Sequence, residues 1–271
     1  MPNNLVSLII PAFNEEKTVG AVIDDTAQIM NLYGIPYEII VVNDGSTDKT
    51  ELAALSTRKA KVLTNKSNHG KGYCVRRGIK HAHGDILVTL DSDGEHKPKE
   101  IPELINPLFQ GCDVVSGSRF ISRRPEVTTK INQVGNFLFN SVILALTGRQ
   151  VTDSQTGFRA MKREVVDKLN LQSNGYEIET EITVKSLMNG FKFKEVPITI
   201  ERRKYSMSKI KILSDGKKIL TSIVRSTFSQ LGEDPKPQSL LFENFTVDLN
   251  RRTEDMMLNH SNIASENIVP K

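Results

Sequence analysis

Residues 5–16 read LVSLIIPAFNEE, an apolar run rich in branched side chains that becomes polar at its carboxyl end. A short apolar run bounded in this way is typical of a strand that is buried on both faces. Apolar residues then recur at helical spacing, at Val19, Val22, Ile23 and Met30. A strand followed directly by a helix favours a parallel sheet covered by helices.

The same alternation continues along the chain. Apolar runs predict strands at residues 5–11, 37–43, 61–65, 86–91 and 114–118. Helices are expected to open at Ser46-Thr47-Asp48 and at Gly70-Lys71. The chain is therefore predicted to have an α/β fold with a mainly parallel, Rossmann-like central sheet.

Beyond Thr152 the alternation breaks down. The pattern there predicts a loop at 153–159, a helix over 177–188 and a strand over 192–201. We expect this second part of the chain to complete the side of the site where an acceptor substrate binds.

The 271 residues fit one large domain with an extension. We expect a catalytic domain over 1–212, an amphipathic helix over 213–231 and a polar, loosely ordered tail over 232–271. The helix places apolar residues near one face and cations beside them, at Lys217, Lys218, Ile219, Leu220, Ile223, Val224, Arg225 and Phe228. Such a helix can pack against the domain or lie at a membrane interface, and the second is favoured because residues 137–146 offer another apolar surface.

Charge and targeting signals narrow the setting. The formal charge of +4 suits nucleotides, phosphates or an anionic membrane surface, and nucleic acid is not favoured as a partner. Cys74 and Cys112 lack metal-ligand spacing, and two cysteines are too few for a disulfide scaffold, which favours a reducing compartment. The start of the chain has no secretory signal pattern, and residues 137–146 are too short for a spanning helix. We expect a cytoplasmic protein, peripheral on the cytoplasmic membrane face.

Three carboxylates follow the predicted strand 86–91, at Asp91, Asp93 and Glu95. Their hard oxygens suit Mg²⁺ or Mn²⁺, which commonly binds through one or two carboxylates together with phosphate oxygens. An Asp-x-Asp sequence found alone is more often a polar turn, here capped by Gly94. Directly after a buried strand, and with other polar strand ends nearby, the same sequence predicts a metal site.

The other strand ends are predicted to bind a nucleotide, because ligands of such sheets lie beyond the carboxyl ends of the strands. Asp44 could accept hydrogen bonds from a base or ribose, or it could cap a helix. Pro11, Phe13 and Glu15 form either a strand-to-helix turn or a platform on which the base stacks. Lys71, in a glycine-bearing turn before a helix, is placed to meet phosphate.

Basic residues supply candidate phosphate contacts. Arg119 could grip a phosphate through two donors, or it could form an ion pair with a site carboxylate. Arg203 and Lys209 belong to a basic loop at 202–211 that could close over a diphosphate, or form a solvated basic surface.

Seven motifs taken in order resemble the family 2 glycosyltransferases of GT-A fold. They are PAFNE (11–15), NDGSTD (43–48), NHGKG (68–72), DSDGE (91–95), GSR (117–119), DSQTGFR (153–159) and RKYSMSK (203–209). The resemblance runs from about Leu5 to Phe228, and it is strongest to dolichyl-phosphate mannose and glucose synthases.

The resemblance implies a role for each matching residue. Asp91, Asp93 and Glu95 would hold Mg²⁺ or Mn²⁺, Arg119 would face the acceptor phosphate, and Asp93, Arg119 and Asp153 are the expected catalytic residues. The expected donor-binding set is Pro11, Phe13, Glu15, Val42, Asp44, Lys71, Asp91, Ser92, Gln155, Arg203 and Lys209. Arg159 would help to shape the sugar and acceptor pocket. The chain departs from the polyprenyl-phosphate branch at Ser92, Glu95 and Ser206, where Ala, Gln and Gly are common.

The resemblance also implies an inverting transfer of a sugar from GDP-mannose, UDP-glucose or a UDP-N-acetylhexosamine to a polyprenyl (dolichyl) phosphate, as in protein glycosylation. A lipid phosphate is already anionic and needs no strong base, but the site must hold two phosphate groups close together. If the acceptor were a saccharide hydroxyl, a base would be needed among Asp153, Glu177, Glu179 and Glu181. A non-catalytic sugar-nucleotide binder is the remaining alternative.

Two other enzyme classes fit the sequence less well. A sugar-nucleotide pyrophosphorylase normally opens with a glycine-rich basic loop, where this chain has PAFNE at 11–15. A processive polysaccharide synthase would carry spanning helices and a Gln-x-x-Arg-Trp motif, and the chain contains no tryptophan.

Overall fold

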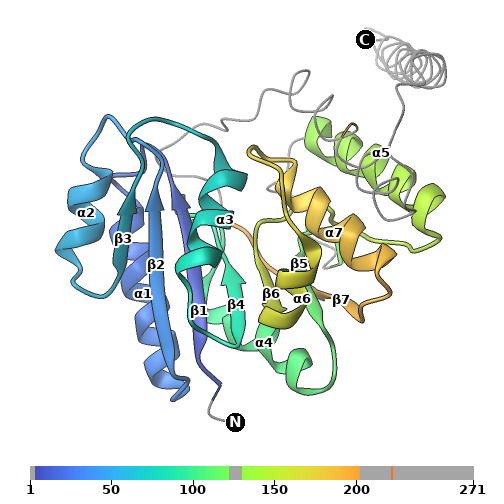
Figure 1. Ribbon diagram of the computed structural model, residues 1–271, viewed down its shortest axis with the longest axis horizontal. Coiled ribbons are helices and arrows are strands. Elements are labelled where there is room, and N and C mark those ends of the chain that lie inside the picture. Colours follow the sequence, from blue (N-terminus) through green and yellow to red (C-terminus); the bar gives the residue numbers. More distant parts are fainter. Residues whose placement is uncertain (1–3, 122–129, 202–220, 222–271) are drawn as a thin grey trace, which may run out of the picture. The chain divides into compact units, whose positions relative to one another are not determined.

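A computed structural model of the chain describes residues 4–121, 130–201 and 221, with the backbone alone for 130–134. Within these residues, seven strands form one sheet in the order β3-β2-β1-β4-β6-β5-β7 (Figure 1). The predicted helix over 213–231 lies outside the described residues except for Thr221, and so do the predicted tail over 232–271, Arg203 and Lys209.

The first half of the sheet is parallel, as predicted. Its strands are β1 (Val6–Ala12), β2 (Tyr37–Asn43), β3 (Lys61–Thr64) and β4 (Ile86–Thr89). The returning helices are α1 (Val19–Leu32), α2 (Thr50–Ser56) and α3 (Lys71–His81). The strand over 37–43 has the predicted bounds, and the other three differ from their predicted bounds by one or two residues.

The second half contains an antiparallel strand that the sequence analysis did not predict. Strand β5 (Val114–Ser118) is parallel to β7 (Phe193–Pro197), and β6 (Arg159–Lys162) runs antiparallel between β4 and β5. The predicted loop at 153–159 therefore ends in a strand, and the strand predicted over 192–201 is shorter than expected. The sheet is mainly parallel, as predicted.

The remaining helices pack around the sheet or against other helices, and α5 packs on α7. They are the short 3₁₀ helix η1 (Pro98–Glu100), α4 (Ile101–Phe109), α5 (Lys130–Thr147), α6 (Arg163–Leu169) and α7 (Ile178–Met188). Helix α7 corresponds to the helix predicted over 177–188. The sequence analysis assigned no helix to the segments that form α4, α5 and α6.

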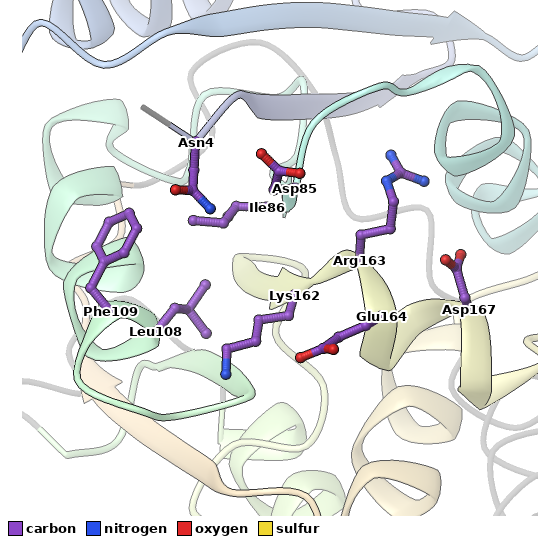
Figure 2. Close-up of a pocket in the computed structure, with 9 residues that line it drawn as sticks. All are labelled: Asn4, Asp85, Ile86, Leu108, Phe109, Lys162, Arg163, Glu164 and Asp167. Carbon is purple, nitrogen blue, oxygen red and sulfur yellow. The ribbon is translucent and has the colours of Figure 1, made fainter. Parts of the chain in front are cut away.

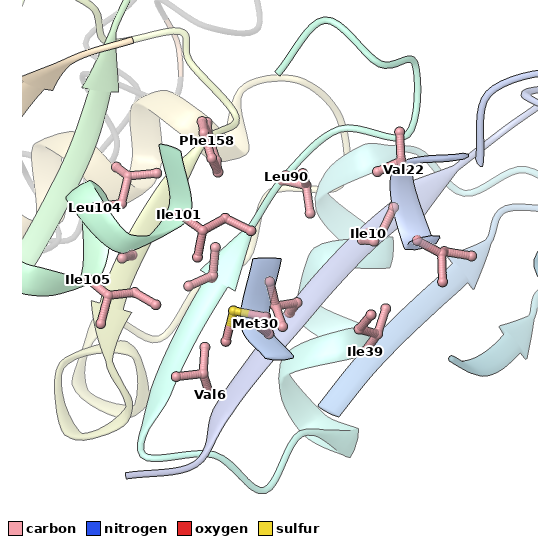
Figure 3. Close-up of a cluster of buried hydrophobic side chains, with 14 of the residues drawn as sticks. Val6, Ile10, Val22, Met30, Ile39, Leu90, Ile101, Leu104, Ile105 and Phe158 are labelled. Atoms are coloured by element: carbon pink, nitrogen blue, oxygen red, sulfur yellow. The ribbon is translucent and has the colours of Figure 1, made fainter. Parts of the chain in front are cut away.

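Alternate residues of the central strands enter two separate cores, one on each face of the sheet. Val6 and Ile10 of β1 lie on the face that α1 and α4 cover, next to Met30 and Val22 of α1 in Figure 3. Ile9 of β1 points to the other face, which α3, α6 and α7 cover. Because both faces are buried, the strands read as continuous apolar runs. A ligand can therefore bind only beyond the ends of the strands.

Candidate active site

Hydrogen bonds join the carboxyl ends of β1, β2 and β4 into one edge. The Asp44 amide donates to the carbonyl of Ala12 at 2.8 Å, which fixes the end of β2 against β1. Ser92 Oγ, just after β4, donates to the carbonyl of Pro11 at 2.9 Å. The strand ends that the sequence predicted to meet are therefore brought together, and Ser92 is buried in a joining role.

The first two loops at this edge are tied to each other. Asn14 has a positive φ of 53°. Its amide donates to Ser46 Oγ at 3.0 Å, and its Oδ1 accepts from the Thr47 amide at 2.9 Å. The amide of Glu15 donates to Thr50 Oγ1 at 2.8 Å. These contacts fix the loop that carries Phe13, the residue on which a base is predicted to stack.

Four of the five predicted nucleoside contacts have buried side chains, namely Pro11, Glu15, Val42 and Asp44. Val42 is fully buried in the core beside α3, and Pro11 is a buried strand residue. Glu15 is 7% exposed and accepts from Thr18 Oγ1 at 3.1 Å. Contact of these residues with a nucleoside stays a prediction.

Asp44 organises the loop that leads into α3. Its Oδ1 accepts from Asn65 Nδ2 at 2.7 Å and from the His69 amide at 2.9 Å, and its Oδ2 accepts from the Gly70 amide at 2.8 Å. Asp44 therefore holds the turn that leads into α3 through the amides of His69 and Gly70, and the helix itself has no side-chain hydrogen bond at its N-cap. The carboxylate at the start of α2 is that of Asp48, which accepts from the Thr50 amide at 2.9 Å.

Lys71, predicted to meet phosphate, lies between two carboxylates, and its contact with a phosphate stays a prediction. Its Nζ is 2.6 Å from Asp91 Oδ1 and 2.9 Å from Glu179 Oε1. Burial alone would lower the pKa of Lys71, but the charges of Asp91 and Glu179 outweigh burial and raise it well above its ordinary value. Lys71 is thus a fixed cation beside the first aspartate of the predicted metal motif.

The rest of the motif is joined to the segment that follows β7. The Glu95 amide donates to Asp93 Oδ1 at 3.0 Å, and Asp93 is 8% exposed. The Glu201 amide donates to the Glu95 carbonyl at 3.0 Å, and His96 forms a bridge with Ile200. The chain therefore leaves the described part beside Glu95 and continues into the basic segment that carries Arg203 and Lys209.

The fit of a metal depends on how many protein ligands it needs. In the described part of the chain, no group of three or more His, Cys, Asp or Glu side chains is arranged to hold a metal ion. Mg²⁺ usually keeps several waters and takes one or two carboxylates together with substrate phosphates. The carboxylates of Asp91, Asp93 and Glu95 at the strand end suit a metal that arrives with a diphosphate, rather than a preformed cage.

Arg119 and Asp153 form the ion pair that was the alternative interpretation of Arg119. Arg119 donates from Nε to Asp153 Oδ2 at 2.6 Å and from Nη2 to Oδ1 at 2.8 Å. Burial lowers the pKa of Arg119, but Asp153 outweighs it, helped by the charges of Glu95 and Asp91, and the net shift is upward. The guanidinium is therefore oriented by Asp153 and lies within the field of the metal motif.

Asp153 is itself held from behind. It is fully buried, and its amide donates to Glu195 Oε1 at 2.8 Å. The amide of Thr152 donates to the other oxygen of Glu195 at 2.8 Å. The amide of Gln155 donates to Asp153 Oδ1 at 3.3 Å, so the 152–155 loop turns around this carboxylate.

Each residue considered as a base for a hydroxyl acceptor is engaged by protein neighbours. Asp153 binds Arg119, and Glu179 binds Lys71. Glu181 accepts from Lys185 Nζ at 2.6 Å and from the Gln172 amide at 2.9 Å. Glu177 Oε1 accepts from the Gly175 amide at 3.0 Å. In this structure, protein groups therefore occupy each of these four carboxylates.

The sequence analysis missed the polar layer beneath the site. Arg159 is fully buried and donates to the carbonyls of Thr156 and Ser154 at 3.0 Å each and to Thr183 Oγ1 at 2.8 Å. Its Nε is also 3.6 Å from Glu179 Oε2. A signal was present in the sequence, since the segment that forms α7 carries polar residues on every side, and the structure shows residues 178–186 all buried. Polar residues on all faces of a buried helix indicate an internal polar network.

A cavity of about 600 Å³ lies at the opposite edge of the sheet (Figure 2). It is bounded by the start of β4 at Ile86 and the end of β6 at Lys162. Arg163 there donates to the carbonyls of Gly84 and Ala82, and Lys162 pairs with Asp113. Because ligands of this sheet type bind beyond the carboxyl ends of the parallel strands, the cavity is not the predicted site.

Comparison with known proteins agrees with this geometry. Residues 7–169 match the family described as glycosyl transferase family 2. A protein of Methanococcus voltae named UDP-N-acetylglucosamine–dolichyl-phosphate N-acetylglucosaminyltransferase is 32% identical over 233 residues, covering 77% of this chain and 90% of the relative. The dolichol-phosphate mannosyltransferase of Pyrococcus furiosus is 34% identical over 214 residues, covering 76% of this chain but 59% of the longer relative.

A solved structure is similar in fold. The glucosyl-3-phosphoglycerate synthase of Mycobacterium tuberculosis, crystallised with Mn²⁺, uridine diphosphate and phosphoglyceric acid, superposes with a TM-score of 0.64 at 24% identity. The match covers 86% of this chain and 80% of that one.

Proposed function

Because the chain belongs to glycosyl transferase family 2 and has the GT-A fold, we propose that it transfers a sugar from a nucleoside diphosphate to a polyprenyl phosphate. An acceptor phosphate oxygen forms a new bond to the anomeric carbon. The bond from that carbon to the donor phosphate breaks, and the nucleoside diphosphate leaves with the bonding electrons. The configuration at the anomeric carbon is inverted.

The choice of acceptor rests on the engaged carboxylates. A saccharide hydroxyl must lose a proton during transfer. Three of the four candidate bases, Asp153, Glu179 and Glu181, are buried and bound to cations, and Glu177 is half-buried and accepts from a backbone amide. A phosphate monoester is already anionic and needs a cation near its path rather than a base. Relatives named as transferases to dolichyl phosphate support the same acceptor class.

Arg119 is the proposed contact for the acceptor phosphate. Asp153 orients the guanidinium by accepting from Nε and Nη2. The remaining N–H groups, including those of Nη1, therefore point in a fixed direction. An arginine fixed in this way binds phosphate without first losing side-chain freedom. Asp153 therefore acts by orienting Arg119.

The donor diphosphate is proposed to bind at the metal motif. Asp91, Asp93 and Glu95 would hold Mg²⁺ or Mn²⁺, which when bound neutralises charge on the departing diphosphate. Arg203 and Lys209 would add cations from the segment that begins beside Glu95. Pro11, Phe13, Glu15, Val42 and Asp44 would line the nucleoside side.

Contact with the cytoplasmic face of a membrane is part of the proposal. Within the described residues, no helix has both the length and the apolar character needed to cross a bilayer. Helix α5 nevertheless exposes Phe137 at 64%, Leu144 at 44% and Leu146 at 38%. A net charge of +4 would favour an anionic cytoplasmic leaflet, where a lipid-linked acceptor is presented.

The test is a transfer assay with labelled GDP-mannose, UDP-glucose and UDP-N-acetylglucosamine, each with a polyprenyl phosphate and Mn²⁺ or Mg²⁺. We expect a lipid-linked product from one donor, no product after chelation with EDTA, and recovery when the metal is restored. Asp93→Asn should lower the rate by roughly 10- to 100-fold or more. Transfer to a free saccharide without any lipid-linked product would refute the acceptor class and keep the family assignment.

A further inference from the structure

Lys71 and Glu179 join two helices directly beneath Asp91. Lys71 is the first residue of α3, and Glu179 is the second residue of α7. The side chains of Lys71 and Glu179 are 14% and 4% exposed, and the lysine nitrogen bonds to both Asp91 and Glu179. Glu179, from the second half of the chain, is thus linked through Lys71 to Asp91, the first aspartate of the predicted metal motif.

The surroundings fix this arrangement on every side. The Gly72 and Tyr73 amides donate to the carbonyls of Gly175 and Asn174 at 3.2 and 3.1 Å, which docks the start of α3 on the loop before α7. Thr89 Oγ1 donates to the Gly157 carbonyl at 2.8 Å, and this glycine lies directly against the Lys71 and Asp91 side chains. The pair therefore has little freedom to rearrange.

The charges explain why both residues are needed. Without Lys71, the carboxylates of Asp91 and Glu179 would lie close together with no cation between them, a costly arrangement in a buried site. Without Glu179, Lys71 would face Asp91 alone, with buried Arg159 nearby as a second cation. In the observed arrangement Asp91 Oδ1 is tied to Lys71, so the direction of its other oxygen, Oδ2, is set.

We propose that Lys71 and Glu179 are positioning residues that hold Asp91 in the orientation required by the donor and link helix α7 to the donor motif. This inference rests on the proposed function, since it concerns the same site. It differs from the sequence-based prediction for Lys71, in which the lysine contacts phosphate itself.

The experiment is a double-mutant cycle with Lys71→Met, Glu179→Gln and the double variant, followed by urea unfolding and by steady-state kinetics. Lys71→Met and Glu179→Gln should each lower the free energy of unfolding. The loss in the double variant should be smaller than the sum of the two single losses, because Glu179→Gln removes one of the two carboxylates that Lys71→Met leaves without the lysine. Both variants that lack Lys71 should lose roughly 10- to 100-fold in kcat, with KM for the acceptor little changed.

A matched control lies on the same helix. Lys185 is a buried lysine 2.6 Å from Glu181, one turn further along α7 and outside the proposed site. Lys185→Met should be destabilised in the manner of Lys71→Met, yet its kcat per folded molecule should equal that of the wild type. The comparison separates positioning of Asp91 from a general need for buried ion pairs.

Three results would overturn the proposal. If the effects of Lys71→Met and Glu179→Gln on the free energy of unfolding simply add, the two residues are not coupled. If the double variant regains wild-type kcat together with stability, the pair only supports the fold. If the wild-type chain transfers sugar from no donor, the proposed function fails and the positioning role fails with it, while coupling in the unfolding data still shows whether the pair exists.

Discussion

Gly157 has no room for a side chain, because a Cβ at this position would collide with Lys71 Nζ and lie 2.9 Å from Asp91 Oδ2. Gly157→Ala therefore displaces the Lys71–Asp91 ion pair without changing any charge. We expect kcat for transfer to fall by roughly 10- to 100-fold, since small misplacements of reacting groups carry large costs. Steady-state kinetics with the preferred donor would measure the loss.

Gly20 provides the control for that substitution. It lies in α1, and the nearest atom to an added Cβ is the Ala53 carbonyl oxygen at 3.7 Å, an ordinary contact distance. Gly20→Ala should leave kcat unchanged and stabilise the helix slightly. If Gly157→Ala also keeps full activity, the Lys71–Asp91 geometry does not matter for transfer.

Asp44 makes a different residue-scale prediction, because the three hydrogen bonds that it accepts all hold the loop before α3. In Asp44→Asn, an amide NH₂ would face at least one of the donors from Asn65, His69 and Gly70. We expect a loss of about 1–3 kcal/mol in the free energy of unfolding, measured in urea. Asp24→Asn, which removes an exposed ion pair with Lys59, should change stability by less than about 1 kcal/mol.

Sequence position predicted at which edge of the sheet the candidate site residues lie, but not how they pair. Asp44, Asp91 and Arg119 each follow a buried strand, so the parallel topology brings them to one edge of the sheet. The partner of Lys71 could not be predicted in the same way, because Glu179 lies far along the chain on a helix whose docking depends on the whole second half. Local spacing therefore predicted a phosphate contact for Lys71 but not its two carboxylate partners.

At the scale of elements, β6 shows a limit of pattern reading. The strand has four residues, begins with Arg159 and ends with Lys162, so it lacks the apolar run that marked the other central strands. Arg159 is tolerated inside the sheet because carbonyls from the preceding turn and a hydroxyl from α7 satisfy its donors. These partners come from tertiary packing, which a single strand's sequence does not reveal.

Glu181 of helix α7 makes a pH-dependent contribution to the free energy of unfolding that can be tested. Burial alone would raise the pKa of Glu181, but hydrogen bonds from Lys185 and from the Ser173 amide outweigh it and lower the pKa. A carboxyl with a lowered folded-state pKa contributes stability that is present above its unfolded value, about 4.3, and is lost as pH falls through the folded value. Urea unfolding at a series of pH values should show stability declining over that acidic range.

Several carboxylates contribute to this loss of stability at acidic pH, so a variant is needed to identify the contribution of Glu181. Glu38, Asp48 and Asp113 also have lowered pKa values and should contribute in the same direction. In Glu181→Gln the slope of stability against pH should be shallower, and the variant should be less stable at neutral pH because Lys185 loses its partner. An unchanged slope would mean that Glu181 titrates alike in the folded and unfolded chains.

At the scale of the whole catalytic unit, α5 and α2 expose similar apolar side chains at different ends of the sheet (Figure 1). Phe137 on α5 is 64% exposed, and Leu52 on α2 is 61% exposed. If α5 contacts the bilayer, Phe137→Ser should weaken binding to phosphatidylcholine vesicles containing phosphatidylserine by about tenfold, since full burial of a Phe side chain is worth about 1.5–3 kcal/mol.

Leu52→Ser makes the comparison specific, because it removes an equally exposed apolar group from a helix that flanks β3 rather than the proposed acceptor side. Cosedimentation with vesicles should be unchanged for this variant. Transfer from a nucleotide sugar to a short, water-soluble polyprenyl phosphate should be normal for both variants, since neither residue lies at the strand ends. If both variants lose vesicle binding equally, or neither does, α5 is not the surface that meets the membrane.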